Sequence, residues 1–185
     1  RMEAATYLAA AAATRGELTL TDVCPEHLTA VTAMQRRAGC EISETKRTLH
    51  LRCEKLLAVG PIRTAPYDGF PTDAQAPMMA AMTVAEGVSV FEENIFEDRL
   101  RHVSALRRLG AQITATHTHA VVTGVDRLHG ARMEATDLRG GAAMVIGALC
   151  AEGESVLTEI GHIERGYADF VPLLQSCGAE IERRS

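Results

Sequence analysis

The sequence has no tryptophan, few aromatic residues and no excess of positive charge, and each absence narrows what the protein can be. Aromatic residues make up 4% of the 185 residues, so the core has to be aliphatic. The net charge of −5 at pH 7 argues against a non-specific nucleic-acid binder, because such proteins need a basic surface. With 46% hydrophobic and 23% charged residues the chain matches ordinary globular domains. We therefore expect a folded domain with no nucleic-acid partner, although a local basic pocket remains compatible with this charge.

Long hydrophobic runs and paired cysteine motifs are also missing. The alanine-rich apolar runs at residues 4–14 and 142–151 are too short to span a bilayer and follow no signal-peptide pattern. His117 and His119 could face one side of a strand, but no third ligand stands at a suitable spacing, so no metal site is expected. The cysteines are odd in number and lack CxxC spacing: Cys24, Cys40, Cys53, Cys150 and Cys177. These features predict reduced thiols in a cytoplasmic protein without a membrane partner.

A unit of helix, strand, helix and strand occurs three times along the chain. Two glycines mark each copy, with equal spacing in the first two copies and two residues more in the third: Gly16 and Gly39, Gly87 and Gly110, Gly153 and Gly178. The first two copies add a closing strand, over residues 48–52 and 120–123, whereas the third ends before one. Because tiled units share one core, we predict a single α/β domain with repeats at about 1–56, 62–125 and 131–185, the third incomplete. The repeats should surround a common axis, with their helices packed together.

The first motif whose side chains could take part in catalysis is FPTDAQ, residues 70–75, at the start of a predicted helix. Thr72 or Asp73 fits an N-cap, whose side-chain oxygen accepts a hydrogen bond from the first turn. Asp73 also fits a carboxylate at the mouth of the repeat axis that takes a proton from a substrate hydroxyl. Caps are the commoner use of such residues, and the residues alone leave both interpretations open.

The second motif is ATDLRGG, residues 135–141. Asp137 again fits a cap, but Arg139 lies in the first turn, where a cation faces the positive end of the helix dipole. That position is favourable if Arg139 and free N–H groups of the turn share an anion, for which the adjacent glycines leave room. The alternative is an ordinary ion pair of Arg139 with Asp137 or Glu134.

The third motif is HIERGY, residues 162–167, which also lies near a helix start. Its Glu164 and Arg165 fit an exposed ion pair, or Arg165 is a second guanidinium aimed at the same anion. The second copy carries NIFEDR, residues 94–99, at the corresponding place. This internal alignment puts Arg99 and Arg165 at comparable points of their repeats.

Taken together, FPTD (70–73), IFEDR (95–99), ATDLR (135–139) and ERGY (164–167) resemble the UDP-N-acetylglucosamine 1-carboxyvinyltransferases. The resemblance covers essentially the whole chain. It implies transfer of the enolpyruvyl group from phosphoenolpyruvate to the 3′-hydroxyl of UDP-N-acetylglucosamine, the first committed step of peptidoglycan synthesis. It also implies an inside-out α/β barrel of three βαβαββ units. This chain would be the domain formed mainly by the C-terminal half of such an enzyme, with the other domain absent.

The resemblance further implies a role for each motif residue. Asp73 would lie beside the sugar 3′-hydroxyl and remove its proton, and the backbone at Ile95 would contact the UDP-sugar. Arg139 and Arg165 would hold phosphoenolpyruvate, with Asp137 near the reacting centre. The acid of this family is associated with a loop of the other domain. No metal or organic cofactor is implied.

Two points qualify these expectations. Pro77 lies in the helix that follows Asp73 and departs from the family's pattern, which puts the geometry of Asp73 in question. A different class of function is also compatible with the residues, namely a free-standing repeat domain that binds an anionic ligand or a partner protein without catalysis.

Overall fold

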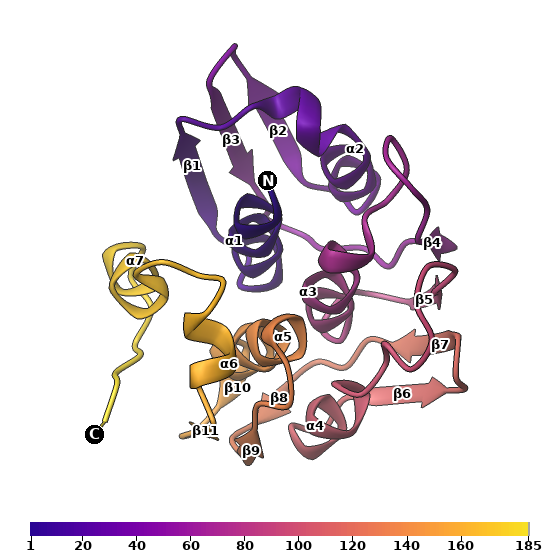
Figure 1. Cartoon of the computed structure of the whole chain (residues 1–185), viewed down its shortest axis with the longest axis vertical. Helices are drawn as coiled ribbons and strands as arrows, with labels where there is room; N and C mark the ends of the chain where they lie inside the picture. Colours follow the sequence, from indigo (N-terminus) through magenta and orange to yellow (C-terminus); the bar gives the residue numbers. More distant parts are fainter. Residues whose placement is uncertain (185) are drawn as a thin grey trace.

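Three helices form the centre of the computed structural model, which describes residues 1–184. These are α1 (Met2–Ala13), α3 (Thr72–Met82) and α5 (Leu138–Leu149), and they pack against one another with the strands outside them (Figure 1). Every residue of α3 from Ala74 to Met82 is buried, as expected of a helix that is apolar all round. The core is aliphatic as predicted, with Phe70 and Phe91 among the aromatic residues that it contains.

The second repeat shows the complete unit. Its elements are β4 (Ile62–Arg63), α3, β5 (Val88–Glu92), α4 (Val103–Arg108), β6 (Gln112–Ala115) and β7 (His119–Thr123). They form a sheet of order β4-β5-β7-β6, in which β4 runs parallel to β5 and the other pairs are antiparallel. This is the βαβαββ order implied by the resemblance.

The first repeat contains the same elements without the leading strand. After α1 come β1 (Glu17–Thr21), the 3-10 helix η1 (Pro25–Leu28), α2 (Thr29–Arg37), β2 (Glu41–Glu44) and β3 (Thr48–Arg52). The sheet has the order β1-β3-β2 and is antiparallel throughout. One helix of each of these two repeats, α1 and α3, lies toward the centre of the molecule (Figure 1).

The third repeat is shorter than the other two. It comprises β8 (Leu128–His129), β9 (Arg132–Glu134), α5, β10 (Ala151–Glu152), β11 (Val156–Thr158), α6 (Gly161–Glu164) and α7 (Phe170–Ser176). β10 pairs in parallel with β8, and β11 pairs in parallel with β9. The second strand of the unit, which the repeat predicts after Gly178 and around Ile181, is not formed. Ile181 instead packs beside α7 and its carbonyl accepts a hydrogen bond from Gln175.

The edges of these sheets explain why the expected strand is missing. β5 has a neighbour on each side, whereas, within residues 1–184, β1 pairs only with β3 and β11 only with β9. A strand forms only where another strand accepts its hydrogen bonds, and no segment of residues 1–184 occupies the position beside β11 that β7 occupies beside β5. In the part of the chain that the structure describes, β1 and β11 are thus edge strands, each with one side unpaired.

Most of the glycines that mark the repeats have a backbone conformation that favours glycine. Five of them have positive φ values, which glycine adopts at little steric cost: Gly39, Gly87, Gly110, Gly153 and Gly178. Three of these, Gly39, Gly110 and Gly178, directly follow the C-cap of a helix. Gly16 is the exception, because the left-handed conformation after α1 falls on Arg15, with φ 56°.

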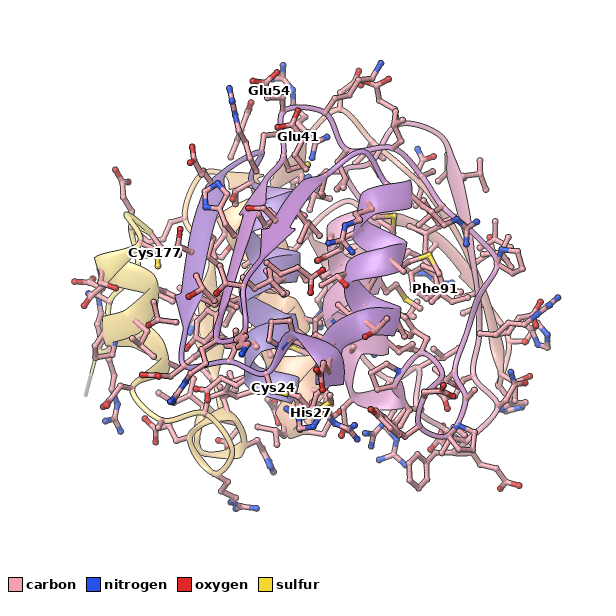
Figure 2. All side chains as sticks on the ribbon, turned by 90° about the horizontal axis from the view of Figure 1, so that it is seen from above. Cys24, His27, Glu41, Glu54, Phe91 and Cys177 are labelled. Atoms are coloured by element: carbon pink, nitrogen blue, oxygen red, sulfur yellow. The ribbon has the colours of Figure 1, made fainter. Side chains whose placement is uncertain are left out.

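Residues 1–184 contain neither a membrane-spanning helix nor a cluster of metal ligands. No helix within residues 1–184 has the length and apolar character to cross a membrane. No cluster of three potential metal ligands occurs there either. All five cysteines are free, and Cys24 and Cys177 lie well apart in Figure 2. Burial raises the pKa of Cys150 to about 12, so this thiol is protonated at neutral pH.

Candidate active site

Asp73 lies in the first turn of α3, at the end of the helix bundle where α1 and α5 also begin. Its Oδ1 accepts a hydrogen bond from Nη2 of Arg99 at 2.6 Å and lies 3.4 Å from Nε of Arg139. Pro71 is the N-cap of α3, without a side-chain capping bond. The cap interpretation of Thr72 and Asp73 is therefore wrong, and the Asp73 carboxylate is held by two guanidinium groups instead.

Arg139 extends from the first turn of α5 and is held on several sides. Its Nη1 donates to the hydroxyl of Tyr167 at 3.1 Å, and its guanidinium lies 5.6 Å from the centre of the Tyr167 ring. The Tyr167 hydroxyl also hydrogen-bonds Thr6 of α1 at 2.7 Å. The expected alternative of an ion pair with Asp137 or Glu134 is not what forms, because the acidic partner of Arg139 is Asp73.

Asp137 is the N-cap of α5. Its Oδ1 accepts hydrogen bonds from the backbone N–H groups of Arg139 at 3.0 Å and Gly140 at 2.8 Å. The cap prediction is confirmed. The expectation that free N–H groups of this turn share an anion with Arg139 is wrong for these two groups, because Asp137 already accepts their hydrogen bonds. Asp137 thereby fixes the turn from which Arg139 extends.

Arg165 follows α6 and is exposed. Its turn packs against the start of α5, since a side chain on Gly166 would lie 2.5 Å from the side chain of Leu138. Within residues 1–184 the Arg165 guanidinium makes no ion pair or hydrogen bond, so the predicted pair with Glu164 does not form. The structure thus places Arg165 beside the beginning of α5, with its guanidinium exposed.

Arg99 and Tyr167 are functional candidates to which the sequence analysis gave no role. Asp98, with φ 59°, turns the chain so that Arg99 reaches Asp73, and the Arg99 guanidinium lies over the Phe96 ring at 5.1 Å. Two signals could have identified Arg99: its internal alignment with Arg165 and its place in the IFEDR motif. Tyr167 was visible in the ERGY motif, but its contact with Arg139 depends on the tertiary fold.

A cavity of about 430 Å³ opens beside Asp73. Ile95 and Asp73, the two residues expected to contact the sugar, both line it. The remaining wall includes Tyr67 from the loop before α3 and His27 from η1, which is labelled in Figure 2. A hollow of about 250 Å³ over α4 and β6 contains none of the predicted site residues.

The Asp73 carboxylate is in direct contact with two cations. One carboxylate faces the guanidinium groups of Arg99 and Arg139, whose side chains are 33% and 16% exposed. His102, which directly precedes α4, adds no charge at neutral pH. Burial lowers the pKa of its imidazole to about 4, although the nearby Asp137 carboxylate acts in the opposite direction. The arrangement can therefore accept a small anion beside a carboxylate.

Comparisons with known proteins agree with this architecture. The model of the EPSP synthase (3-phosphoshikimate 1-carboxyvinyltransferase) family matches residues 1–174. A UDP-N-acetylglucosamine 1-carboxyvinyltransferase from Magnetococcus marinus is 46% identical over 99% of this chain and 44% of its own length. One from Desulfofundulus thermocisternus is 45% identical over 99% of this chain and 75% of its own length. The chain thus spans less than half of the first relative and three quarters of the other.

Solved structures give the same result for the fold. The enolpyruvyl transferase NikO from Streptomyces tendae has a TM-score of 0.86 at 25% identity, over 98% of this chain and 43% of its own. EPSP synthase from Acinetobacter baumannii has a TM-score of 0.78 at 18% identity, over 100% of this chain and 46% of its own, and shows the fold alone. The resemblance found in the sequence and the predicted α/β fold are confirmed. The chain belongs to the EPSP synthase family, which is the family of the enolpyruvyl transferases.

Proposed function

We propose that this chain provides the carboxylate and arginine side of an active site that transfers the enolpyruvyl group from phosphoenolpyruvate to UDP-N-acetylglucosamine. The observation that carries the proposal is Asp73, which lies between Arg99 and Arg139 at the edge of a cavity large enough for part of a sugar. The relatives that are 42% to 46% identical to the chain bear the name of this activity. The reaction would belong to peptidoglycan synthesis in the cytoplasm, and hence to cell wall biogenesis, cell shape and cell division.

Asp73 is placed to act as the base. Both guanidinium contacts involve Oδ1, while Oδ2 has no hydrogen-bond partner within residues 1–184. The side chain is 36% exposed, so a hydroxyl in the cavity can reach Oδ2. A general base must lie within hydrogen-bond distance of the proton that it removes. We assign Oδ2 of Asp73 to the sugar 3′-hydroxyl, with the backbone at Ile95 as a second contact to the sugar.

The arginines suit the other substrate. Phosphoenolpyruvate carries a phosphate and a carboxylate, and charge-assisted hydrogen bonds from guanidinium groups bind such oxygens strongly. We assign Arg139 and Arg165 to this anion, because Arg139 lies in the first turn of α5 and the turn that carries Arg165 packs against it. Asp137 lies beside the reacting centre in this assignment and holds the turn that carries Arg139.

The proposed reaction has two stages. The 3′-oxygen loses its proton to Asp73 and bonds to the central carbon of phosphoenolpyruvate, while the methylene carbon gains a proton. The methylene-derived carbon then loses a proton, the carbon–oxygen bond to phosphate breaks, and the double bond is restored. Fixed positive charge stabilises the negative charge on phosphate in both stages. We assign the acid to the other domain of the same enzyme, which is therefore the protein partner of this chain.

The experiment compares the full-length product of the gene that encodes this chain with residues 1–185 alone. Phosphate release is measured with phosphoenolpyruvate and UDP-N-acetylglucosamine, and the enolpyruvyl product is identified by mass spectrometry. The full-length protein should release phosphate and form the enolpyruvyl product from these two substrates. The isolated chain should be slower by at least about 10²- to 10⁴-fold, because the acid and one wall of the cleft are missing.

Shikimate 3-phosphate replaces the UDP-sugar in a parallel reaction and tests the acceptor. Turnover of shikimate 3-phosphate but not of UDP-N-acetylglucosamine by the full-length protein would contradict the proposed substrate. Equal turnover by the isolated chain would contradict the division of the site between two domains. Binding of phosphoenolpyruvate without any turnover would favour the non-catalytic anion-binding domain.

A further inference from the structure

Glu93 directly follows β5 and is a buried carboxylate, 2% exposed. Its Oε1 accepts hydrogen bonds from the Thr64 hydroxyl at 2.9 Å and from the backbone N–H groups of Ile95 at 2.9 Å and Phe96 at 3.2 Å. Its Oε2 accepts one from the Thr72 hydroxyl at 2.9 Å. No Lys or Arg side chain of residues 1–184 pairs with Glu93. Burial of an unpaired charge is costly, so the buried carboxylate depends on these four hydrogen bonds for its stability. The same four bonds hold it in one position.

The donors come from three segments that form one wall of the cavity beside Asp73. Thr64 begins the loop that leads to Pro71, and Thr72 opens α3, whose next residue is Asp73. Ile95 belongs to the turn that leads to Arg99. Glu93 thus joins the loop, the start of α3 and the turn through a single side chain. Each of these segments also lines the cavity.

We infer that Glu93 is a positioning residue for the substrate site. Through Thr72 it fixes the first turn of α3 and with it the Asp73 carboxylate. Through the two N–H groups it fixes the Ile95 backbone. One buried carboxylate therefore determines the position of the base, Asp73, and of the backbone that contacts the sugar, at Ile95. This inference rests on the proposed function, in which Asp73 and Ile95 meet the UDP-sugar.

The two oxygens of Glu93 allow these effects to be separated. Thr72→Val removes the single bond to Oε2, keeps the shape of the side chain and leaves the three bonds to Oε1 in place. It should lower kcat about 10- to 100-fold through misplacement of Asp73, with little change in KM for phosphoenolpyruvate. Thr72→Ser keeps the hydroxyl and should retain kcat within about twofold of the wild type.

Glu93→Ala removes the acceptor of the Ile95 and Phe96 N–H groups and should raise KM for the UDP-sugar about tenfold or more. Glu93→Gln keeps one oxygen for these N–H groups. Its amide nitrogen faces the Thr72 hydroxyl, which can rotate to accept a hydrogen bond. The KM of this variant for the UDP-sugar should therefore stay close to that of the wild type. Glu92→Gln is the matched control, because Glu92 is the preceding residue and pairs with Arg63 away from the cavity.

The experiment uses the full-length protein and three measurements: kcat and KM for both substrates, the melting temperature, and hydrogen exchange at the Ile95 and Phe96 amides. A kcat loss in Thr72→Val with recovery in Thr72→Ser, together with faster exchange in Glu93→Ala but not in Glu92→Gln, supports the inference. Lower melting temperatures with unchanged kcat and KM in both Thr72→Val and Glu93→Ala would overturn it.

Hydrogen exchange separates this inference from the proposed function. A wild-type protein without turnover would contradict the proposed function alone. Glu93→Ala would still report on the positioning role, since unchanged exchange at Ile95 and Phe96 shows that Glu93 does not hold the turn. Should Glu93→Ala fail to fold, Thr72→Val, which removes a single hydrogen bond to Glu93, decides the matter. Its readout is hydrogen exchange at the Ala74 amide, which donates to the Pro71 carbonyl in the first turn of α3.

Discussion

Replacement of Asp73 by asparagine should lower kcat of the full-length protein about 10²- to 10⁴-fold, the usual effect of removing a general base. Asparagine has nearly the same shape, so the turn at the start of α3 should remain folded. It cannot take a proton at neutral pH, and it no longer attracts the Arg99 and Arg139 guanidinium groups. Steady-state phosphate release measures the loss.

Asp22→Asn is the matched control for this substitution. Asp22 is an exposed aspartate with φ 56°, a conformation that asparagine adopts readily, and it pairs with Arg47 outside the cavity. Its replacement should leave kcat unchanged. Retention of more than about one tenth of kcat by Asp73→Asn, with a melting temperature equal to that of the wild type, would show that Asp73 is not the base.

Replacement of Arg139 by alanine should raise KM for phosphoenolpyruvate about 10- to 100-fold. A hydrogen bond to a charged group contributes about 1.5–3 kcal/mol, which corresponds to this range. Arg139→Lys should restore part of the affinity, because lysine retains the charge but not the planar pair of donors. The binding of inorganic phosphate, measured by calorimetry, gives an independent value. Arg127→Ala, an exposed arginine paired with Glu152, is the control and should bind as the wild type does.

The double variant of Arg139 and Arg165 tests whether the two arginines hold one anion. If they do, each single alanine variant weakens the binding of phosphate, and the effect of the double variant differs from the sum of the two. Additive effects would place them on separate ligands. Unchanged binding in both single variants would show that both are ordinary surface residues.

Much of the fold was predictable because the repeat leaves local signals. A glycine after a helix predicts a left-handed residue, and Gly39, Gly110 and Gly178 all adopt this conformation. The prediction was wrong at Gly16, where Arg15 takes the left-handed position. The Thr14 hydroxyl bonds the Ala10 carbonyl at this helix end, a local contact that the glycine rule does not consider.

The strand expected at Ile181 shows the limit of arguments from internal repetition. Repetition predicts which segment could form a strand, but the strand needs a neighbour to accept its hydrogen bonds. Within residues 1–184 the neighbour is missing, so Ile181 packs beside α7. The third repeat thus has the sequence pattern of the strand, but not the neighbouring strand with which it would pair.

The candidate site was predictable only in part. The motifs identified Asp73 and Arg139 as chemically unusual residues at helix starts, but did not indicate that they contact each other. The bond between Thr6 and Tyr167 and the bonds of Glu93 join residues from distant segments or different elements. Such contacts follow from the packing of the repeats, and no spacing in the sequence encodes them.

The most direct test of the proposed site is a crystal structure of the full-length protein with UDP-N-acetylglucosamine. The sugar should occupy the cavity beside α3, with its 3′-hydroxyl within about 2.6–3.2 Å of Oδ2 of Asp73, the distance that proton transfer requires. The Ile95 backbone should contact the same sugar. A sugar bound elsewhere, or a 3′-hydroxyl directed away from Asp73 while the protein turns over in solution, would contradict the assignment of Asp73 as the base.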